Sequence, residues 1–124
     1  MRKAVICKYE LAPHGSVVHR DVKVVDAPNE KNVLEFLYEK IGCKTVDVAY
    51  LPNNILAWVN DEGMIEGGNV VCDYGNGAIL AGTIVFSASE TGHDGKTNWL
   101  DSVEAVNYAI DIAEKSELKG VTRG

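Results

Sequence analysis

Short polar turns divide most of this chain into runs of strand-forming residues, and the positions of these turns constrain the fold more than any other feature. Residues 3–9, 17–25 and 45–51 are rich in Val, Ile and Tyr. A turn at residues 12–16 separates the first two runs, and Pro52-Asn53-Asn54 follows the third. Because such short turns join antiparallel neighbours, they predict hairpins rather than parallel crossovers.

Three more apolar runs follow the Pro52-Asn53-Asn54 turn. Residues 55–59 form the expected return strand, and residues 70–72 are a short apolar piece. Residues 79–86 are the most apolar run, which predicts one central strand with Gly82 as a bulge or a close-packing point. Gly75-Asn76-Gly77 is typical of a hairpin turn.

Two segments carry helical patterns instead. The first begins near Pro28, has apolar residues at helical spacing from 33 to 41, and is expected to end at Gly42. The second begins at Asp101-Ser102-Val103-Glu104, the pattern of a capping box. Its buried stripe is predicted to be Val103, Val106, Ile110 and Ala113. We expect this second helix to continue to about Lys119.

These elements predict an α+β fold in which a largely antiparallel sheet of five to seven strands packs against two helices. The 124 residues suit a single domain, 1–124, with 120–124 as a loose tail. Apolar residues make up 46% and charged residues 24%, which is typical of a globular protein.

Charge and cysteine content narrow the possible partners. The net charge of −6 disfavours general nucleic-acid binding. Cys7, Cys43 and Cys72 are widely spaced, which indicates free thiols in a reducing compartment rather than a disulfide framework or a zinc pair. The apolar stretch near the first residue is too short for a signal peptide or a membrane span. We therefore expect a cytoplasmic protein without a membrane partner.

No catalytic or metal-binding motif is recognisable in the chain. His14, His19 and His93 do not share a metal-ligand spacing. His93 and Asp94 could together orient an imidazole, but no motif ties a serine or cysteine nucleophile to them. The acids from Asp61 to Glu66 do not meet the EF-hand pattern. The sequence predicts no catalytic residue, no cofactor and no metal.

A polar stretch at residues 87–98 is the strongest candidate for function, because polar loops of this length often bind ligands. Phe86 and Trp99 flank it, and Asn98 lies beside Trp99. An aromatic ring can stack on a base and an amide can bond its polar edge. The alternative is that both aromatic residues anchor the ends of the loop to the core.

A second candidate feature is a row of cations near the end of the chain. Lys115, Lys119 and Arg123 are spaced by four, so they share one face if the helix continues that far. They either complement the helix dipole or form an anion site. The predicted ligand-binding residues are thus Phe86, Asn98, Trp99, Lys115, Lys119 and Arg123.

The middle of the chain resembles a known family. The resemblance lies in IGCKTVDVAYL (41–51), AWVNDEG (57–63), GNGAILAGTIVF (75–86), the Gly-His-Asp-Gly loop and the capped helix. Small proteins of phages, prophages and mobile elements, classed as a domain of unknown function, share this pattern. The chain is also similar to phage anti-defence sponge proteins that inhibit Thoeris. Those proteins bind cyclic ADP-ribose-type signals without cleaving them and work as oligomers.

The resemblance implies which residues would hold such a ligand. A strand-end aromatic, a loop asparagine and basic residues of the last helix match Phe86, Asn98, Lys115 and Lys119. The two lysines depart from the arginines that bind phosphate best. The first hypothesis is a non-enzymatic, homo-oligomeric phage protein that sequesters a nucleotide-derived immune signal. The alternatives are a protein-interaction inhibitor of a host or defence protein, and a small hydrolase that uses His93.

Overall fold

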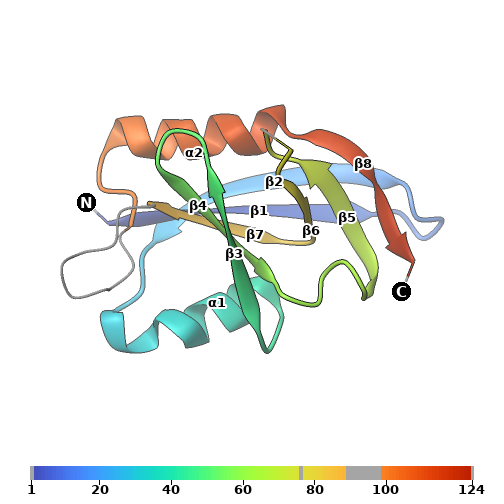
Figure 1. Cartoon of the computed structure of the whole chain (residues 1–124), viewed down its shortest axis with the longest axis horizontal. Coiled ribbons are helices and arrows are strands. Elements are labelled where there is room, and N and C mark those ends of the chain that lie inside the picture. Colours follow the sequence, from blue (N-terminus) through green and yellow to red (C-terminus); the bar gives the residue numbers. More distant parts are fainter. Residues whose placement is uncertain (1, 76, 89–98, 124) are drawn as a thin grey trace.

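The computed structural model describes residues 2–75, 77–88 and 99–123. Within them the chain forms two helices and eight strands in two antiparallel sheets, which confirms the α+β prediction (Figure 1). The large sheet contains β1 (Lys3–Leu11), β2 (Val17–Asp26), β3 (Val46–Leu51), β4 (Ile55–Asn60) and β7 (Ile84–Ala88). The small sheet contains β5 (Gly67–Asp73), β6 (Ile79–Ala81) and β8 (Glu117–Arg123).

The hairpins that the turns predicted are present. The strand order is β2-β1-β7-β4-β3 in the large sheet and β6-β5-β8 in the small one. β1 pairs with β2, and β3 pairs with β4 through Leu51 opposite Ile55. β7 lies between β1 and β4, so the most buried strand occupies the centre of the large sheet.

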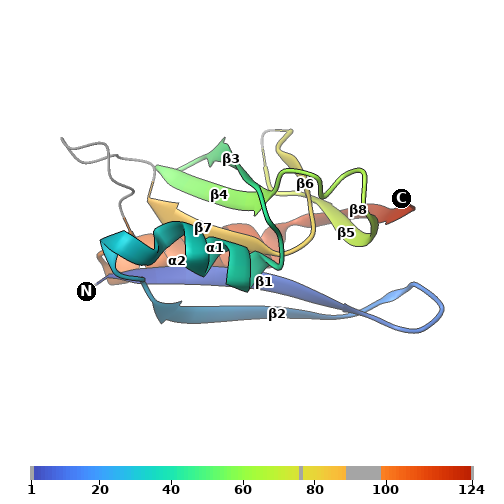
Figure 2. The same cartoon turned by 90° about the horizontal axis from the view of Figure 1, so that it is seen from below.

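The helices α1 (Val33–Ile41) and α2 (Val103–Lys115) cover opposite faces of the large sheet (Figure 1 and Figure 2). A short 3-10 turn, η1 (Glu30–Asn32), precedes α1, and Gly42 ends that helix with φ 77° as predicted. Alternate residues of β1 point to opposite sides, so Val5 packs beneath α2 while Ala4 packs beneath α1. No helix in the described ranges is both long and apolar enough to cross a membrane.

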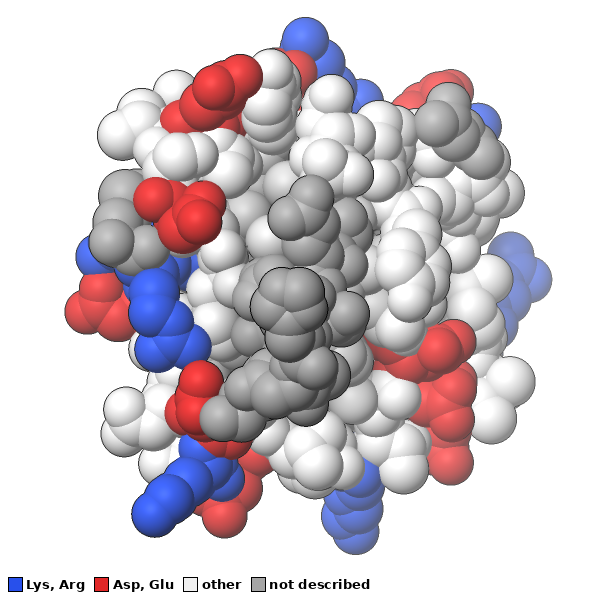
Figure 3. All heavy atoms as spheres, turned by 60° about the vertical axis from the view of Figure 1, so that its left-hand side comes forward, with Lys and Arg blue, Asp and Glu red and all other residues white. Residues whose placement is uncertain are grey.

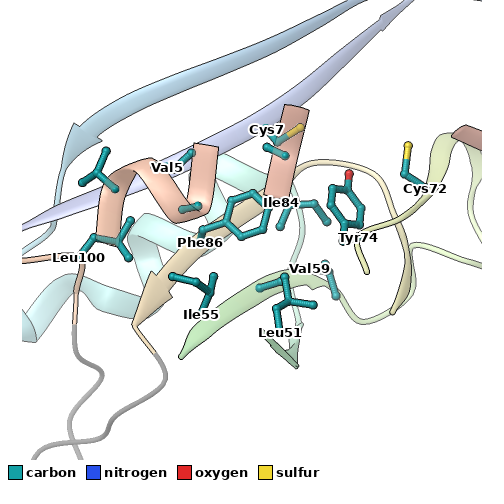
Figure 4. Packing of buried hydrophobic residues seen from close by; sticks show 14 of the residues in the cluster. Val5, Cys7, Leu51, Ile55, Val59, Cys72, Tyr74, Ile84, Phe86 and Leu100 are labelled. Carbon is teal, nitrogen blue, oxygen red and sulfur yellow. The ribbon is translucent and has the colours of Figure 1, made fainter. Parts of the chain in front are cut away.

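Phe86 lies at the centre of the core beneath α2. Its side chain is fully buried, and its ring meets that of Tyr74 edge-on with centroids 6.1 Å apart. Figure 4 shows the ring among Val5, Ile55 and Ile84. Large aromatic side chains contribute most when they are buried in this way, so packing accounts for this residue.

The single strand predicted at 79–86 is wrong, because the run divides into β6 and β7, which belong to different sheets. Gly82, between them, has φ 83° and donates its N–H to the carbonyl of Val70 at 2.9 Å. A Cβ atom at this position would lie 3.3 Å from Asn69 Oδ1. The left-handed backbone that glycine permits redirects the chain from one sheet to the other.

The start of α2 also differs from the prediction. The N-cap is Ser102 rather than Asp101, and its Oγ accepts a hydrogen bond from the Ala105 N–H at 3.1 Å. Val103 is 67% exposed and does not belong to the buried stripe. The buried face consists of Val106, Ala109 and Ala113. Val106 and Ala113 of the predicted stripe are buried and Ile110 is partly buried against the core, whereas Val103, the first residue of the helix, is exposed.

The predicted helix end at Lys119 and the loose tail at 120–124 are also wrong. The helix ends at Lys115, and the chain continues as β8, which pairs with β5. Val121 lies opposite Val70 in this pairing. Only Gly124 of the expected tail lies outside the described residues. The strand forms because it pairs with β5. Local periodicity does not reveal this pairing, because the partner residues are more than forty positions earlier in the chain.

Candidate functional site

The two predicted stacking residues lie on opposite sides of the large sheet. Phe86 is buried on the side of α2. Trp99 is only 4% exposed and packs on the side of α1, edge-on to Phe36 with ring centroids 5.8 Å apart. They do not form one platform, and Asn98 lies outside the described residues.

The three predicted cations do not share a helix face. Lys115 ends α2 and pairs with Asp111 at 3.0 Å, whereas Lys119 and Arg123 belong to β8. Lys119 pairs with Glu117 at 3.4 Å. At 1.5 Å per residue, Lys115 lies about 18 Å along the helix from its first turn. The cations and Trp99 are therefore at opposite ends of α2.

A cavity of about 460 Å³ opens at the N-terminal end of α2, which we call the α2 cavity. Ile55, Ala88 and Leu100 supply apolar surface to its lining. Its polar groups come from Arg2, Asn53, Asn54, Asp101, Glu104 and Tyr108. Trp99, Ser102 and Ala105 complete the lining. Figure 3 shows this end of the molecule, where acidic and basic side chains lie around the edge of the view among uncharged residues. The volume falls within the range of roughly 300–1,000 Å³ that is typical of small-molecule sites.

Backbone hydrogen bonds hold the cavity walls together. Lys3 and Leu100 form an isolated antiparallel bridge with N–H to O distances of 2.8 and 2.9 Å. The carbonyl of Arg2 accepts a bond from the Ala27 N–H at 3.0 Å. These bonds attach Arg2 to the end of β2 and the start of α2 to β1, so both walls rest on the large sheet.

Asn53 and Asn54 supply two amides from the turn between β3 and β4. Their backbones are left-handed, with φ 62° and 58°. Asparagine tolerates this conformation better than most residues, so turn chemistry accounts for the residue type. The side chains nevertheless line the α2 cavity, where they can donate and accept hydrogen bonds.

Carboxylates dominate the side of the cavity formed by α2. Asp101 and Glu104 lie at the helix N-terminus, where negative charge complements the helix dipole. The Tyr108 hydroxyl donates a 2.9 Å hydrogen bond to Glu104 Oε1. This bond, together with the charge of Glu104, raises the pKa of Tyr108. The wall therefore keeps a protonated phenol beside carboxylate acceptors.

The Trp99 indole has a polar atom that no described residue satisfies. Its Nε1 is buried and has no hydrogen-bond partner among the described residues. In contrast, the indole of Trp58 donates to Ser87 Oγ at 2.9 Å. A buried donor without a partner costs about 1–3 kcal/mol. An acceptor brought to this N–H would remove that cost.

The histidines and cysteines form no metal-binding group in the described ranges. His14 bonds to Ser16 Oγ through Nε2 at 2.6 Å in an exposed turn, and His93 lies outside the described residues. No set of three His, Cys, Asp or Glu side chains in the described part could hold a metal ion. The cysteines are free, with Cys7 and Cys72 buried and Cys43 partly exposed.

The opposite end of α2 contains a polar cluster, formed by Tyr9, Arg20, Cys72, Tyr74 and Ser116, that the sequence did not predict. Tyr9 is its centre, because its hydroxyl lies 3.2 Å from the Tyr74 hydroxyl and 3.1 Å from Ser116 Oγ. The Cys72 thiol donates to the same hydroxyl at 3.2 Å. Burial and the bond from Cys72 raise the pKa of Tyr9 to about 12.

Arg20 links this polar cluster to the end of α2. Its guanidinium donates to the carbonyls of Glu114 at 2.5 Å and Ser116 at 3.1 Å, and it lies 5.5 Å from the centroid of the Tyr9 ring. A cation at a helix C-terminus satisfies exposed carbonyls and complements the dipole. The residues come from three separate strands, the position after β5 and the end of α2, so no local motif indicates the cluster.

Comparison with known proteins gives a family but no activity. A model of the DUF3846 family, described as a domain of unknown function, matches residues 16–109. The chain belongs to this family. In this DUF3846 protein the matched region includes all of the α2 cavity lining except Arg2, and it excludes β8. No curated protein and no solved structure matches the chain.

Proposed function

We propose that this DUF3846 protein binds and sequesters a small hydrogen-bonding molecule in the α2 cavity and does not transform it. The observation that carries this proposal is the convergence of amides, a guanidinium, a phenol and carboxylates on one hollow with apolar surface. Ligand sites commonly combine apolar surface with a few oriented polar groups.

A nucleotide-derived signal is the ligand class that we propose. The amides of Asn53 and Asn54 suit the polar edge of a base, and the guanidinium of Arg2 suits phosphate oxygens. The resemblance to sponge proteins supports the narrower proposal of a cyclic ADP-ribose-like immune signal. The same resemblance supports a role as a homo-oligomeric phage anti-defence protein in the host cytoplasm.

A second candidate function is inhibition of a host or defence protein by direct contact. Val103 is 67% exposed and Tyr108 is 40% exposed, both near the start of α2. Val103 also lines a shallow outer surface together with Glu104, Asn107 and Tyr108. Exposed apolar side chains ringed by polar ones are typical of protein contact sites.

A thermal-shift screen with cyclic nucleotides and ADP-ribose derivatives tests the first function. A ligand present at a hundred times its Kd should stabilise the protein by about 2.7 kcal/mol. Asn54→Gly should reduce this shift, because it removes an amide from the cavity while suiting the left-handed backbone. Lys119→Gln is the matched control, since Lys119 belongs to β8 and lies outside the cavity.

The remaining outcomes separate the alternatives. Mass spectrometry of the ligand released by denaturation should recover it intact, whereas a cleaved product would favour the hydrolase. If no nucleotide raises the melting temperature and a captured host protein is lost on Val103→Lys, the direct-contact inhibitor replaces the sequestration proposal.

A further inference from the structure

A second hollow adjoins the α2 cavity through one shared residue. This α1 hollow, of about 540 Å³, is lined by Arg2, Asn29, Glu30, Lys31 and Asn32. Arg2 also lines the α2 cavity. Both hollows therefore lie beside Arg2, which separates one from the other.

The two hollows differ in charge. The α1 hollow contains the cations Arg2 and Lys31 and the carboxylate of Glu30. The side of the α2 cavity beyond Arg2 contains the carboxylates of Asp101 and Glu104. With Arg2 counted in both, the α1 hollow has one more cation than carboxylates and the α2 cavity has one more carboxylate than cations. An anionic group is therefore favoured in the α1 hollow and disfavoured in the α2 cavity.

The neutral polar groups fit the same division. Asn29 and Asn32 precede η1 and α1, and neither side chain forms a helix-capping hydrogen bond within the described residues. Their amides can therefore donate to an anion in the α1 hollow. In the α2 cavity, Tyr108 already donates to Glu104 Oε1, which leaves carboxylate oxygens to accept from hydroxyls or amines.

Lys3, the cation next to Arg2 in the chain, has a different role. Lys3 forms an ion pair with Asp26 at the end of β2. The hydrogen bond and the charge of Lys3 lower the pKa of Asp26. The ammonium group of Lys3 is thus paired with Asp26 of β2. Arg2 is the cation that lines both hollows.

We infer that the two hollows form one polarised site that takes a nucleoside phosphate, with the phosphate at Arg2 and Lys31 and the nucleoside in the α2 cavity. The guanidinium of Arg2 offers paired donors to phosphate oxygens. The carboxylates of Asp101 and Glu104 accept from ribose hydroxyls or an exocyclic amine. This inference rests on the proposed small-ligand function and assigns the orientation and chemical class of its ligand.

Calorimetric titration of the full chain with adenosine, adenosine monophosphate and inorganic phosphate tests the inference. We expect the monophosphate to bind about tenfold more tightly than adenosine, because a charge-assisted bond is added. Arg2→Gln and Lys31→Gln should each remove most of that gain. Lys31→Gln, whose residue does not line the α2 cavity, should also leave adenosine binding unchanged. Lys119→Gln, the matched surface control, should change neither affinity.

Each other outcome has a distinct meaning. Equal affinities for adenosine and its monophosphate, or a gain that persists in Arg2→Gln, would overturn the polarised site while the α2 cavity remained a binding site. Absence of binding by all three probes would overturn this ligand class. A thermal shift with a molecule that is not a nucleotide would then preserve the proposed sequestration alone. Both exposed variants should keep the wild-type melting temperature.

Discussion

The two ends of α2 use their polar groups in opposite ways. At the C-terminal end, Arg20 bonds to the last helix carbonyls, and Tyr9 joins Tyr74, Ser116 and Cys72. At the N-terminal end, Ser102 caps the helix while the neighbouring amides and carboxylates line a hollow. Polar groups that satisfy one another stabilise the fold, whereas polar groups that face a hollow are free to bind another molecule.

Removal of Arg20 should have the largest effect on stability. Arg20→Ala deletes the bonds to the carbonyls of Glu114 and Ser116 and the cation over Tyr9. We expect a loss of about 2–3 kcal/mol in the free energy of unfolding, measured with urea. Lys115→Ala breaks only an exposed helix pair and should cost about 0.5 kcal/mol or less. Equal costs for both variants would contradict the structural role of Arg20.

Alkaline pH should weaken the polar cluster next. Burial raises the pKa of Tyr9 from 10.0 to about 12 and raises that of Tyr74 as well. Both phenols are protonated in either state well below pH 10, so their contribution is complete there. Above about pH 10 the unfolded chain loses these protons first, and the free energy of unfolding falls as pH rises toward 12.

Urea titrations at several alkaline pH values would measure this slope. Tyr9→Phe should make it shallower and cost about 1–2 kcal/mol at neutral pH, because three polar partners lose the hydroxyl. Tyr50→Phe is the control, since Tyr50 is exposed on β3. A slope that is the same in both variants would show that the phenol of Tyr9 does not control alkaline unfolding.

At the N-terminal end of α2 the helix cap should have a smaller effect. Ser102→Ala removes the acceptor for the Ala105 N–H and should cost about 1 kcal/mol. Ser102→Gly should cost only a few tenths of that. If Ser102→Ala destabilised the protein more than Arg20→Ala in the same urea assay, the larger structural role assigned to the C-terminal end of α2 would be contradicted.

Asn54→Gly should have the smallest effect on stability. The φ of 58° suits glycine, so the free energy of unfolding should change by no more than about 0.5 kcal/mol. Loss of the amide should nevertheless reduce the ligand-induced melting shift. A large loss of stability would mean that the Asn54 side chain supports the fold, as the polar cluster does.

Local patterns predicted the hairpins and the first helix because the signals lie within the elements themselves. The turn at Asn53 and Asn54 and the termination at Gly42 depend on backbone conformations that these residues adopt readily. β8 depends on pairing with β5, more than forty positions earlier. The division at Gly82 depends on β6 and β7 pairing in different sheets, with β5 and with β1 and β4. The hydrophobic periodicity of a single segment does not predict which strands pair with each other.

The candidate site was less predictable than the fold. Of the six predicted ligand residues, Trp99 lines the α2 cavity, whereas Phe86 fills the core. Arg2 and Asn54 reach the cavity from distant positions, and neither stands in a motif. The bridge between Lys3 and Leu100 brings Arg2 to the cavity, and the pairing of Ile55 with Ala88 brings Asn54 there. Both are tertiary contacts without a local signal.

The pairing of β8 with β5 sets an order for folding during synthesis on the ribosome. All five strands of the large sheet precede α2 and β8 in the chain, so they leave the ribosome before β8 and that sheet can assemble first. The small sheet must wait for β8, which follows α2. Until then one edge of β5 lacks its partner, and nascent chains with an open strand edge are prone to aggregate. A translational pause after β5 has left the ribosome and before β8 has left it would therefore prolong a vulnerable intermediate.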